Sequence, residues 1–391
     1  MKLNLITTIA VTFLTCGSSF AQSLVYEGDH GVGNGKHIVF IANDHEYRSE
    51  QTCPAMAKIL AKRFGFRCTV LFGIDESGRI KAGDAPVPGM EALKDADLLF
   101  FFTRFMQLPD DQVDLLVDYF ELGGPVVGLR TSTHCFNGQK GKWSKLNFNY
   151  EGDDYRGGLG EQIFGNTWHD KRGQSHYGPN HQKGSLVVPV SDSVEHPILK
   201  GVEPIHSWCG AYKSQTPSDA TEILHVQVLN KLAPGSKADA DKPLVSAGWT
   251  RKFYVAPSGL KKEARVAYVS FGASEDLLDG NARRCLVNAC LWAIGLENKI
   301  ESNSNVDLVG SYHPSPFSMG TLFFQDVFPS ELSSWESQVM PAGKKLAGVT
   351  NPKMIKRVKR AVAQRPELNA KLSKLYPDIY GAEAKPFGSL K

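Results

Sequence analysis

The sequence predicts an α/β fold built on a doubly wound, mostly parallel sheet with helices on both faces. Short, almost unbroken apolar runs recur in the first half of the chain, and runs of this length suit parallel strands that are covered on both sides. Segments with helical spacing lie between them. A strand, helix, strand, helix order implies right-handed crossovers, so the expected sheet is doubly wound.

The elements follow in order along the chain. Four apolar runs predict the first strands: Ile38–Ala42, Thr69–Phe72, Leu98–Phe102 and Val126–Leu129. Residues 109–122 predict a helix, because Pro and two Asp residues open the segment, one apolar stripe follows, and two Gly residues end it. Later strands are expected at residues 186–190, 222–228 and 266–271, followed by a closing helix over 276–294.

The rest of the chain divides by composition. Residues 36–296 form the predicted domain, although 136–184 is rich in Gly, Asn, aromatic residues and His, with little periodicity. Residues 297–345 predict an extension along the surface. A basic, helical tail is expected over 346–391, since residues 341–391 hold twelve Lys or Arg against three acidic residues. No interleaved aromatics accompany this charge, so we expect a solvated helix and no nucleic-acid partner.

The amino-terminal segment predicts export. Residues 1–21 combine Lys2, an apolar stretch and a small residue pattern ending at Ala21, which is typical of a cleaved signal peptide. Anchoring through a lipidated Cys16 is the alternative. The remaining composition is that of a soluble globular protein, with no membrane span expected. The six cysteines that follow the cleavage point are expected to be buried and apolar in role, and Cys285 and Cys290 lie too far apart along a helix to bridge.

Function is expected at the carboxyl ends of the parallel strands. The most informative stretch is PVVGLRTSTH at 125–134, which predicts a buried strand running into a tight turn with Arg130 at its tip. In α/β enzymes that use this geometry, the turn exposes a Ser or Cys nucleophile. Polar residues also follow the strands that end near Ala42 and Phe102, so three loops should converge.

The chain resembles the ThuA-like, or trehalose-utilisation, family of the class I glutamine amidotransferase-like superfamily, which has a flavodoxin-like fold. The resemblance covers roughly 36–296. It rests on NDHEYRSE at 43–50, TRF at 103–105, GLRTSTH at 128–134, GNTWH at 165–169, HPILKG at 196–201 and VAYVSFGAS at 266–274. NVDLVGSYHPSPF at 305–317 is similar to the tail of exported bacterial members.

Glutaminase chemistry, which the superfamily suggests, is not expected of this chain. The reaction requires a thiolate at the elbow and a His oriented by a carboxylate after a late strand. Arg130 takes the elbow position, Cys135 lies more than a helical turn further on, and the late strand ends in Phe271-Gly272-Ala273-Ser274 without a His. Both required groups are missing.

A polar pocket remains. Two guanidinium groups, on Arg104 and Arg130, could bind a carboxylate, a phosphate or sugar hydroxyls. Acid and base groups come from Asp44, His45 and Glu46, which could move a proton beside a carbonyl while an arginine stabilises the negative charge. The alternative is an ion-pair network that only neutralises these charges. The expected substrate-binding residues are Arg48, Thr103, Arg104, Thr131, Trp168 and Ser274.

Histidines gather in the irregular segment. His134 and His169 are expected to take catalytic or hydrogen-bonding roles, and Trp168 adjoins the second. Imidazoles on a folded loop could hold a divalent metal ion. The spacing fits no compact metal motif, and Arg130 would repel a cation. We therefore predict no metal site and no cofactor, and a metal-dependent hydrolase remains an alternative.

The resemblance implies a protein that acts on a trehalose-like or oxidised disaccharide. A ketone at C3 of a sugar acidifies the neighbouring C–H bonds, so His45 or Glu46 could remove a proton while Arg130 or His134 holds the enolate oxygen. A non-catalytic protein that binds carbohydrate or forms complexes is the second hypothesis, because the amidotransferase groups are lost. The sequence sets no oligomeric state.

Overall fold

The structure is a computed structural model, and its geometry supports a detailed description of most of the chain. The described residues are 23–83, 86–179, 182–317, 327–337, 365, 370 and 374. The predicted signal peptide and nearly all of the predicted basic helix lie outside them. Among the described residues, no helix is long and apolar enough to cross a membrane.

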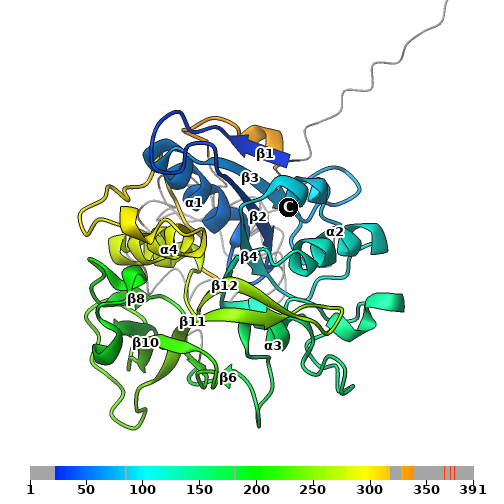
Figure 1. The fold of residues 1–391 in the computed structure, drawn as a ribbon. Coiled ribbons are helices and arrows are strands. Elements are labelled where there is room, and N and C mark those ends of the chain that lie inside the picture. The colour runs from blue at the N-terminus through cyan, green and yellow to red at the C-terminus, as the bar shows by residue number, and fades with distance from the viewer. Residues whose placement is uncertain are drawn as a thin grey trace, which may run out of the picture.

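One sheet of ten strands lies at the centre of the described chain (Figure 1). Its parallel core has the order β3 (Arg67–Phe72), β2 (His37–Asn43), β4 (Leu98–Thr103), β5 (Val126–Leu129) and β12 (Lys261–Val269). The first four of these strands each contain one of the four apolar runs, β12 overlaps the later strand predicted at 266–271, and β2 pairs in parallel with both β3 and β4. The doubly wound α/β class is confirmed, and the core aligns the carboxyl ends of its strands at one edge.

Beyond β12 the sheet continues with antiparallel strands, so it is mixed. These are β11 (Val245–Val255), β10 (Thr221–Val228), β7 (Ser185–Pro189) and β8 (Ile205–Ser207). On the opposite edge, β1 (Ser23–Tyr26) pairs antiparallel with β3. A separate short ladder joins β6 (Ser175–His176) to β9 (Tyr212–Lys213). The sequence indicated two of these strands, β7 and β10, but not their direction.

Helices cover both faces of the sheet, as predicted. Alternate residues of β2 divide between two cores, with Phe40 in one and Ile41 in the other. The first core includes side chains from α1 (Ser49–Phe64) and α4 (Gly280–Ala293). The second includes side chains from α2 (Asp110–Glu121) and α3 (Gly158–Phe164). The period of two in a strand produces this separation.

Two predicted elements differ from the observed ones. The closing helix begins at Gly280 and not at residue 276, because the Asp279 carboxylate accepts a hydrogen bond from the Asn281 amide and caps α4 there (2.8 Å). The preceding Ser274–Leu278 is a short 3₁₀ helix. The irregular segment 136–184 contains α3, which left-handed glycines bound at both ends.

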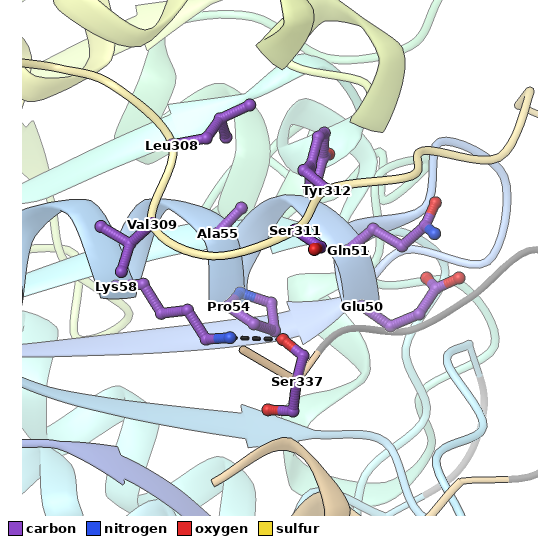
Figure 2. Close-up of a pocket in the computed structure, with 10 residues that line it drawn as sticks. All are labelled: Glu50, Gln51, Pro54, Ala55, Lys58, Leu308, Val309, Ser311, Tyr312 and Ser337. Atoms are coloured by element: carbon purple, nitrogen blue, oxygen red, sulfur yellow. Dashed lines mark hydrogen bonds between the residues drawn. The ribbon is translucent and has the colours of Figure 1, made fainter. Parts of the chain in front are cut away.

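The extension after α4 packs against α1 (Figure 2). Lys58 donates a hydrogen bond to the carbonyl of Trp335 (2.8 Å) and another to that of Ser337. A cavity of about 20 Å³ remains between the extension and α1, room for about one water molecule. Glu50 lines this cavity, and neither of its carboxylate oxygens has a hydrogen-bond partner in the described chain.

All six cysteines outside the amino-terminal segment are buried and free, as expected. Cys285 and Cys290 lie on the same helix without a bridge. Burial raises the pKa of the Cys285 thiol to about 12. These thiols therefore behave as small apolar groups.

Candidate functional site

Three loops converge at the carboxyl edge of β2, β4 and β5, and each contains a residue with unusual backbone geometry. Arg48 (φ 67°), Phe105 (φ 53°) and Arg130 (φ 38°) are the non-glycine residues with positive φ in the described chain. Such conformations cost about 1–3 kcal/mol each and persist where the surrounding structure enforces them. Their confinement to three neighbouring strand ends marks this edge as the candidate site.

Asp44 organises the first loop. Its carboxylate accepts hydrogen bonds from the amides of Glu46 (2.8 Å) and Tyr47 and from the Thr131 hydroxyl (2.5 Å). Asp44, a predicted acid or base, and Thr131, a predicted substrate-binding residue, are both fully buried. These bonds join the loop after β2 to the elbow after β5, so the structure gives Asp44 and Thr131 a positioning role.

Arg104 forms the charged centre of the site with two side chains of the first loop. Its Nε lies 3.2 Å from a Glu46 carboxylate oxygen, and its Nη1 donates to His45 Nε2 at 2.7 Å. An arginine cannot accept a hydrogen bond, so His45 Nε2 carries the lone pair and the ring proton sits on Nδ1. Burial raises the pKa of Glu46 above 4.5, while Arg104 opposes the shift.

A wall of aromatic rings stands beside this charged centre. Phe105 stacks on Phe148 (5.3 Å between ring centroids) and contacts the His134 ring (5.5 Å). Trp168 lies 5.0 Å from His134 and meets His176 edge to face at 4.9 Å. The Arg104 guanidinium lies 4.0 Å above the Phe105 ring, so charge and wall are in contact.

Arg130 occupies the elbow, but its guanidinium is directed into the protein. Nη1 donates to the carbonyl of Ser270 (2.6 Å) and Nη2 to that of Gly210 (3.2 Å). The group lies between the rings of Tyr47 (4.1 Å) and Tyr212 (4.5 Å). The expected elbow geometry is present. With the guanidinium buried and already bonded, the structure assigns it a positioning role, and the anion-binding role does not fit this placement.

A chain of hydrogen bonds fixes the proton on the His134 ring. The elbow carbonyl of Arg130 accepts from the Tyr268 hydroxyl (2.7 Å), and that hydroxyl accepts from Gln174 Nε2 (3.0 Å). Gln174 Oε1 accepts from the Thr133 hydroxyl (2.6 Å), which leaves Thr133 to accept from His134 Nδ1 (3.3 Å). His134 therefore carries its proton on Nδ1 and presents a bare Nε2.

His134 is also held in its neutral form. Burial, together with the positive charges of Arg104 and Arg130, lowers the pKa of His134 well below 6.5. A neutral imidazole with a bare Nε2 accepts a hydrogen bond and cannot donate one there. It therefore suits a substrate hydroxyl better than an enolate oxygen.

The remaining predicted residues lie at different depths. Thr103 is buried at the end of β4, and its hydroxyl has no hydrogen-bond partner within the described chain. Arg48 is buried below the first loop, where it donates to the His45 carbonyl (2.7 Å) and lies 3.5 Å from Glu50. Ser274 is buried as well, donating to the carbonyl of Ser315 (2.8 Å) in the extension. Neither Arg48 nor Ser274 is placed to contact a substrate directly.

Among the described residues, the His169 ring makes no contact with the aromatic rings of the site. Its Nδ1 accepts a hydrogen bond from the Lys171 amide of its own turn (3.2 Å), and its main chain bonds to Gln174. The neighbouring Trp168 makes the contacts with His134. Of the two adjacent residues, the structure thus brings the tryptophan into the site.

The described residues contain no cluster of three or more His, Cys, Asp or Glu side chains arranged to hold a metal ion. At this edge of the sheet, the described residues also lack the cysteine at the elbow and the histidine directly after β12 that glutaminase chemistry requires. Cys135 is buried, which raises the pKa of its thiol to about 12. The residues directly after β12 include no His, and the Asp276 carboxylate accepts from the amides of Gly272 and Ala273 (2.9 and 3.0 Å).

Several site residues were not predicted from the sequence: Phe105, Phe148, Gln174, Tyr212 and Tyr268. Phe105 follows Arg104 directly, so its place at a strand end was a usable signal. Phe148 and Gln174 come from the irregular segment and Tyr212 from the short strand β9, whose positions depend on tertiary packing, while Tyr268 lies within the predicted strand 266–271. Nothing in their local sequence marks them.

Comparisons with known proteins give distant likenesses. No family model and no curated protein matches the chain. A solved ThuA-like protein from Parabacteroides merdae is 13% identical, with a TM-score of 0.41, over 66% of this chain and 90% of that one. A cytoplasmic protein from Salmonella typhimurium is 10% identical, with a TM-score of 0.36, over 66% and 98%.

The glutaminase domain of CTPS from Trypanosoma brucei, solved with bound acivicin, is 12% identical with a TM-score of 0.32. It is covered over 97% of its length by 70% of this chain. At these identities and TM-scores the likenesses say nothing about activity or substrate. The strand order described above defines the fold class of this chain.

Proposed function

We propose that this protein binds an oxidised, trehalose-like disaccharide at the carboxyl edge of β2, β4 and β5 and moves a proton next to its keto group. The observation that carries the proposal is the contact between Arg104, Glu46 and the ring wall of Phe105, Phe148, His134 and Trp168. Flat rings suit the C–H faces of a sugar, and a few polar groups fix its orientation.

In this proposal the groups have different tasks. Glu46 takes the proton from the carbon beside the ketone, because burial raises its pKa toward the range in which a carboxylate is an effective base. Arg104 stabilises the enolate oxygen that forms. The proton returns from Glu46 to the sugar, so atoms and charge balance. His134 Nε2 accepts a hydrogen bond from a sugar hydroxyl.

The test is exchange of substrate hydrogen in D₂O, followed by proton NMR on a 3-keto-disaccharide. The wild-type protein should replace the hydrogen beside the ketone with deuterium, and Glu46→Gln should slow this by at least about 100-fold. Glu161→Gln is the matched control, since Glu161 of α3 pairs with Arg172 (3.2 Å), a residue outside the proposed site. No exchange above the protein-free rate would refute the proposal.

The pH dependence gives a second readout for the same group. Only the ionised Glu46 accepts a proton, and its pKa lies above 4.5. Exchange should therefore fall as the pH drops through a value above 4.5, and the fall should be absent from the residual rate of Glu46→Gln. If the exchange rates of the wild type and of Glu46→Gln fall in the same way at low pH, another residue is the base.

A non-catalytic carbohydrate-binding protein is the second candidate. This function is favoured because charged side chains near the site form hydrogen bonds within the protein. These side chains are Asp44, Arg48 and Arg130. Calorimetric titration separates the two functions. A binding protein should saturate with the unmodified disaccharide and lose affinity in Trp168→Ala, while Glu46→Gln should bind as the wild type does.

We also propose export of the protein, on the strength of the apolar amino-terminal segment 1–21. Mass spectrometry of the protein secreted by a bacterial host tests this, and cleavage near Ala21 is the expected result. An intact amino terminus in the cytoplasm would contradict it.

A further inference from the structure

A residue of the basic tail is buried in the body of the protein. Arg365 is 4% exposed, and its guanidinium forms a two-pronged ion pair with Glu275, through Nε to one carboxylate oxygen and Nη2 to the other (2.7 Å). The planar fork of an arginine matches a carboxylate in this way. The contact joins residues 90 positions apart, so it ties the tail to the 3₁₀ helix after β12.

The carboxylate that receives Arg365 is deeply buried. Burial raises the pKa of Glu275, and Arg365 is the largest influence that opposes this shift. The next residue, Asp276, is also buried, and there the Arg130 guanidinium opposes the rise in its pKa. Two adjacent buried carboxylates are thus each compensated by an arginine, one from the elbow and one from the tail.

The aromatic side chains near Glu275 also suit a guanidinium. Arg365 lies 5.1 Å from the centre of the Trp208 ring, a cation–π distance. His206 meets Trp208 edge to face at 5.2 Å, and the Trp208 amide donates to Asp276 (2.9 Å). A flat cation between an aromatic face and a carboxylate is bound by both.

We propose that the recess formed by Glu275, Trp208 and His206 is an arginine-binding site whose occupant is the basic carboxyl-terminal tail of the same chain. Docking of Arg365 there holds the segment 206–212 in place. Charge complementarity and the depth of the pair identify the occupant, since a surface ion pair would give little binding.

The recess adjoins the candidate site through this segment. The Gly210 carbonyl accepts from Arg130, and Tyr212 contacts Trp168 edge to face at 5.0 Å. Release of Arg365 would leave Glu275 buried without its partner beside Asp276, and the segment would rearrange to admit water. The docked tail therefore supports the rear of the ring wall. This inference concerns docking and does not depend on the sugar chemistry.

Limited trypsin digestion of the full-length protein tests the docking without any sugar. Cleavage within residues 341–391 should be at least about tenfold faster in Arg365→Ala than in the wild type, because the buried pair that holds the tail is gone. Lys374→Ala is the matched control, since it removes another basic residue of the tail that is exposed. Equal cleavage rates in Arg365→Ala and Lys374→Ala would overturn the proposal.

Methylguanidinium tests the recess itself. At millimolar concentration it should raise the unfolding temperature of Arg365→Ala, because a ligand that binds only the folded state stabilises it. It should not raise that of the wild type, whose recess is filled, or of Arg365→Ala combined with Glu275→Gln. The same response in all three proteins, or in none, would show that the recess is not a guanidinium site.

Discussion

At the scale of single residues, the proton on His134 is set by a carbonyl group that never touches the ring. The elbow carbonyl of Arg130 can only accept, so it orients Tyr268, then Gln174, then Thr133 in turn. The imidazole is left with a proton on Nδ1 and a bare Nε2. The strained elbow thus determines a chemical property of a residue four positions later.

Replacing Gln174 with Ala should break this chain in the middle. We expect ¹⁵N NMR of the wild-type protein to show His134 neutral with its proton on Nδ1, and to remain neutral below pH 6.5 because its pKa is lowered. In Gln174→Ala the two tautomers should mix, and substrate exchange should fall about tenfold or more.

The matched control is Gln227→Ala, since Gln227 donates to main-chain carbonyls, among them that of Lys242 (2.7 Å). It should leave the His134 spectrum unchanged. A His134 signal with the proton on Nε2 in the wild type would contradict the hydrogen-bond chain.

The sequence predicted the polar residues of the site better than its rings. Arg104 and Glu46 follow unbroken apolar strands, and the rule that function lies at strand ends found them. Phe148 and Tyr212 come from segments without periodicity, and only tertiary packing brings them together. The direction of the Arg130 side chain was equally invisible, because it depends on carbonyls of Ser270 and Gly210.

At the scale of elements, α1 carries a buried acid that faces the carboxyl-terminal extension. Burial raises the pKa of Glu50 to about 7, and Arg48 only partly opposes this. The folded state therefore keeps a proton that the unfolded state loses above about pH 4.5. The stability that this proton provides is present below pH 4.5 and is lost as the pH rises through about 7.

Glu50→Gln measures this effect. The stability of the wild type relative to Glu50→Gln should fall by about 3 kcal/mol between pH 4.5 and 8, measured as the free energy of unfolding in urea. Glu297→Gln should respond with the opposite sign and at lower pH, because hydrogen bonds from Arg265 lower the pKa of Glu297. A difference for Glu50→Gln that does not vary with pH would contradict the buried-acid account.

The strands of the parallel core were predictable because burial on both faces leaves an unbroken apolar run. The antiparallel pairing of the strands beyond β12 was not predictable. An apolar run does not indicate the direction of a strand, and buried and exposed residues alternate in only part of β11. The start of α4 was misplaced because the acidic residues 275 and 276 resemble a first helical turn. In the structure their carboxylates face buried arginines or main-chain amides instead.

At the scale of the whole molecule, the elbow holds a buried cation that joins the sheet to the segment 206–212. Arg130 bonds to the end of β12 and to the segment 206–212, and it compensates Asp276. Arg365 does the same for Glu275 from the other side. These cations act within the structure, and the Arg104 guanidinium lies over the Phe105 ring of the ring wall.

Arg130→Cys tests this role of the elbow. Removing the guanidinium leaves the carbonyls of Ser270 and Gly210 without their donor and takes away a positive charge that favours the ionised Asp276, so the variant should lose about 3–5 kcal/mol of stability in urea unfolding. It should hydrolyse no glutamine, because residues 270–274, directly after β12, contain no His to activate the thiol. A stable variant that releases ammonia from glutamine would contradict this assignment.

The most direct measurement of the central claim is a crystal structure of Glu46→Gln with a 3-keto-disaccharide, since this variant should bind the substrate without converting it. The account predicts a sugar ring against Trp168 and Phe148, with its ketone oxygen within hydrogen-bond distance of Arg104. A sugar found only elsewhere, for example in the cavity of about 420 Å³ between Gln107–Asp110 and Gly138–Gly141, would contradict it.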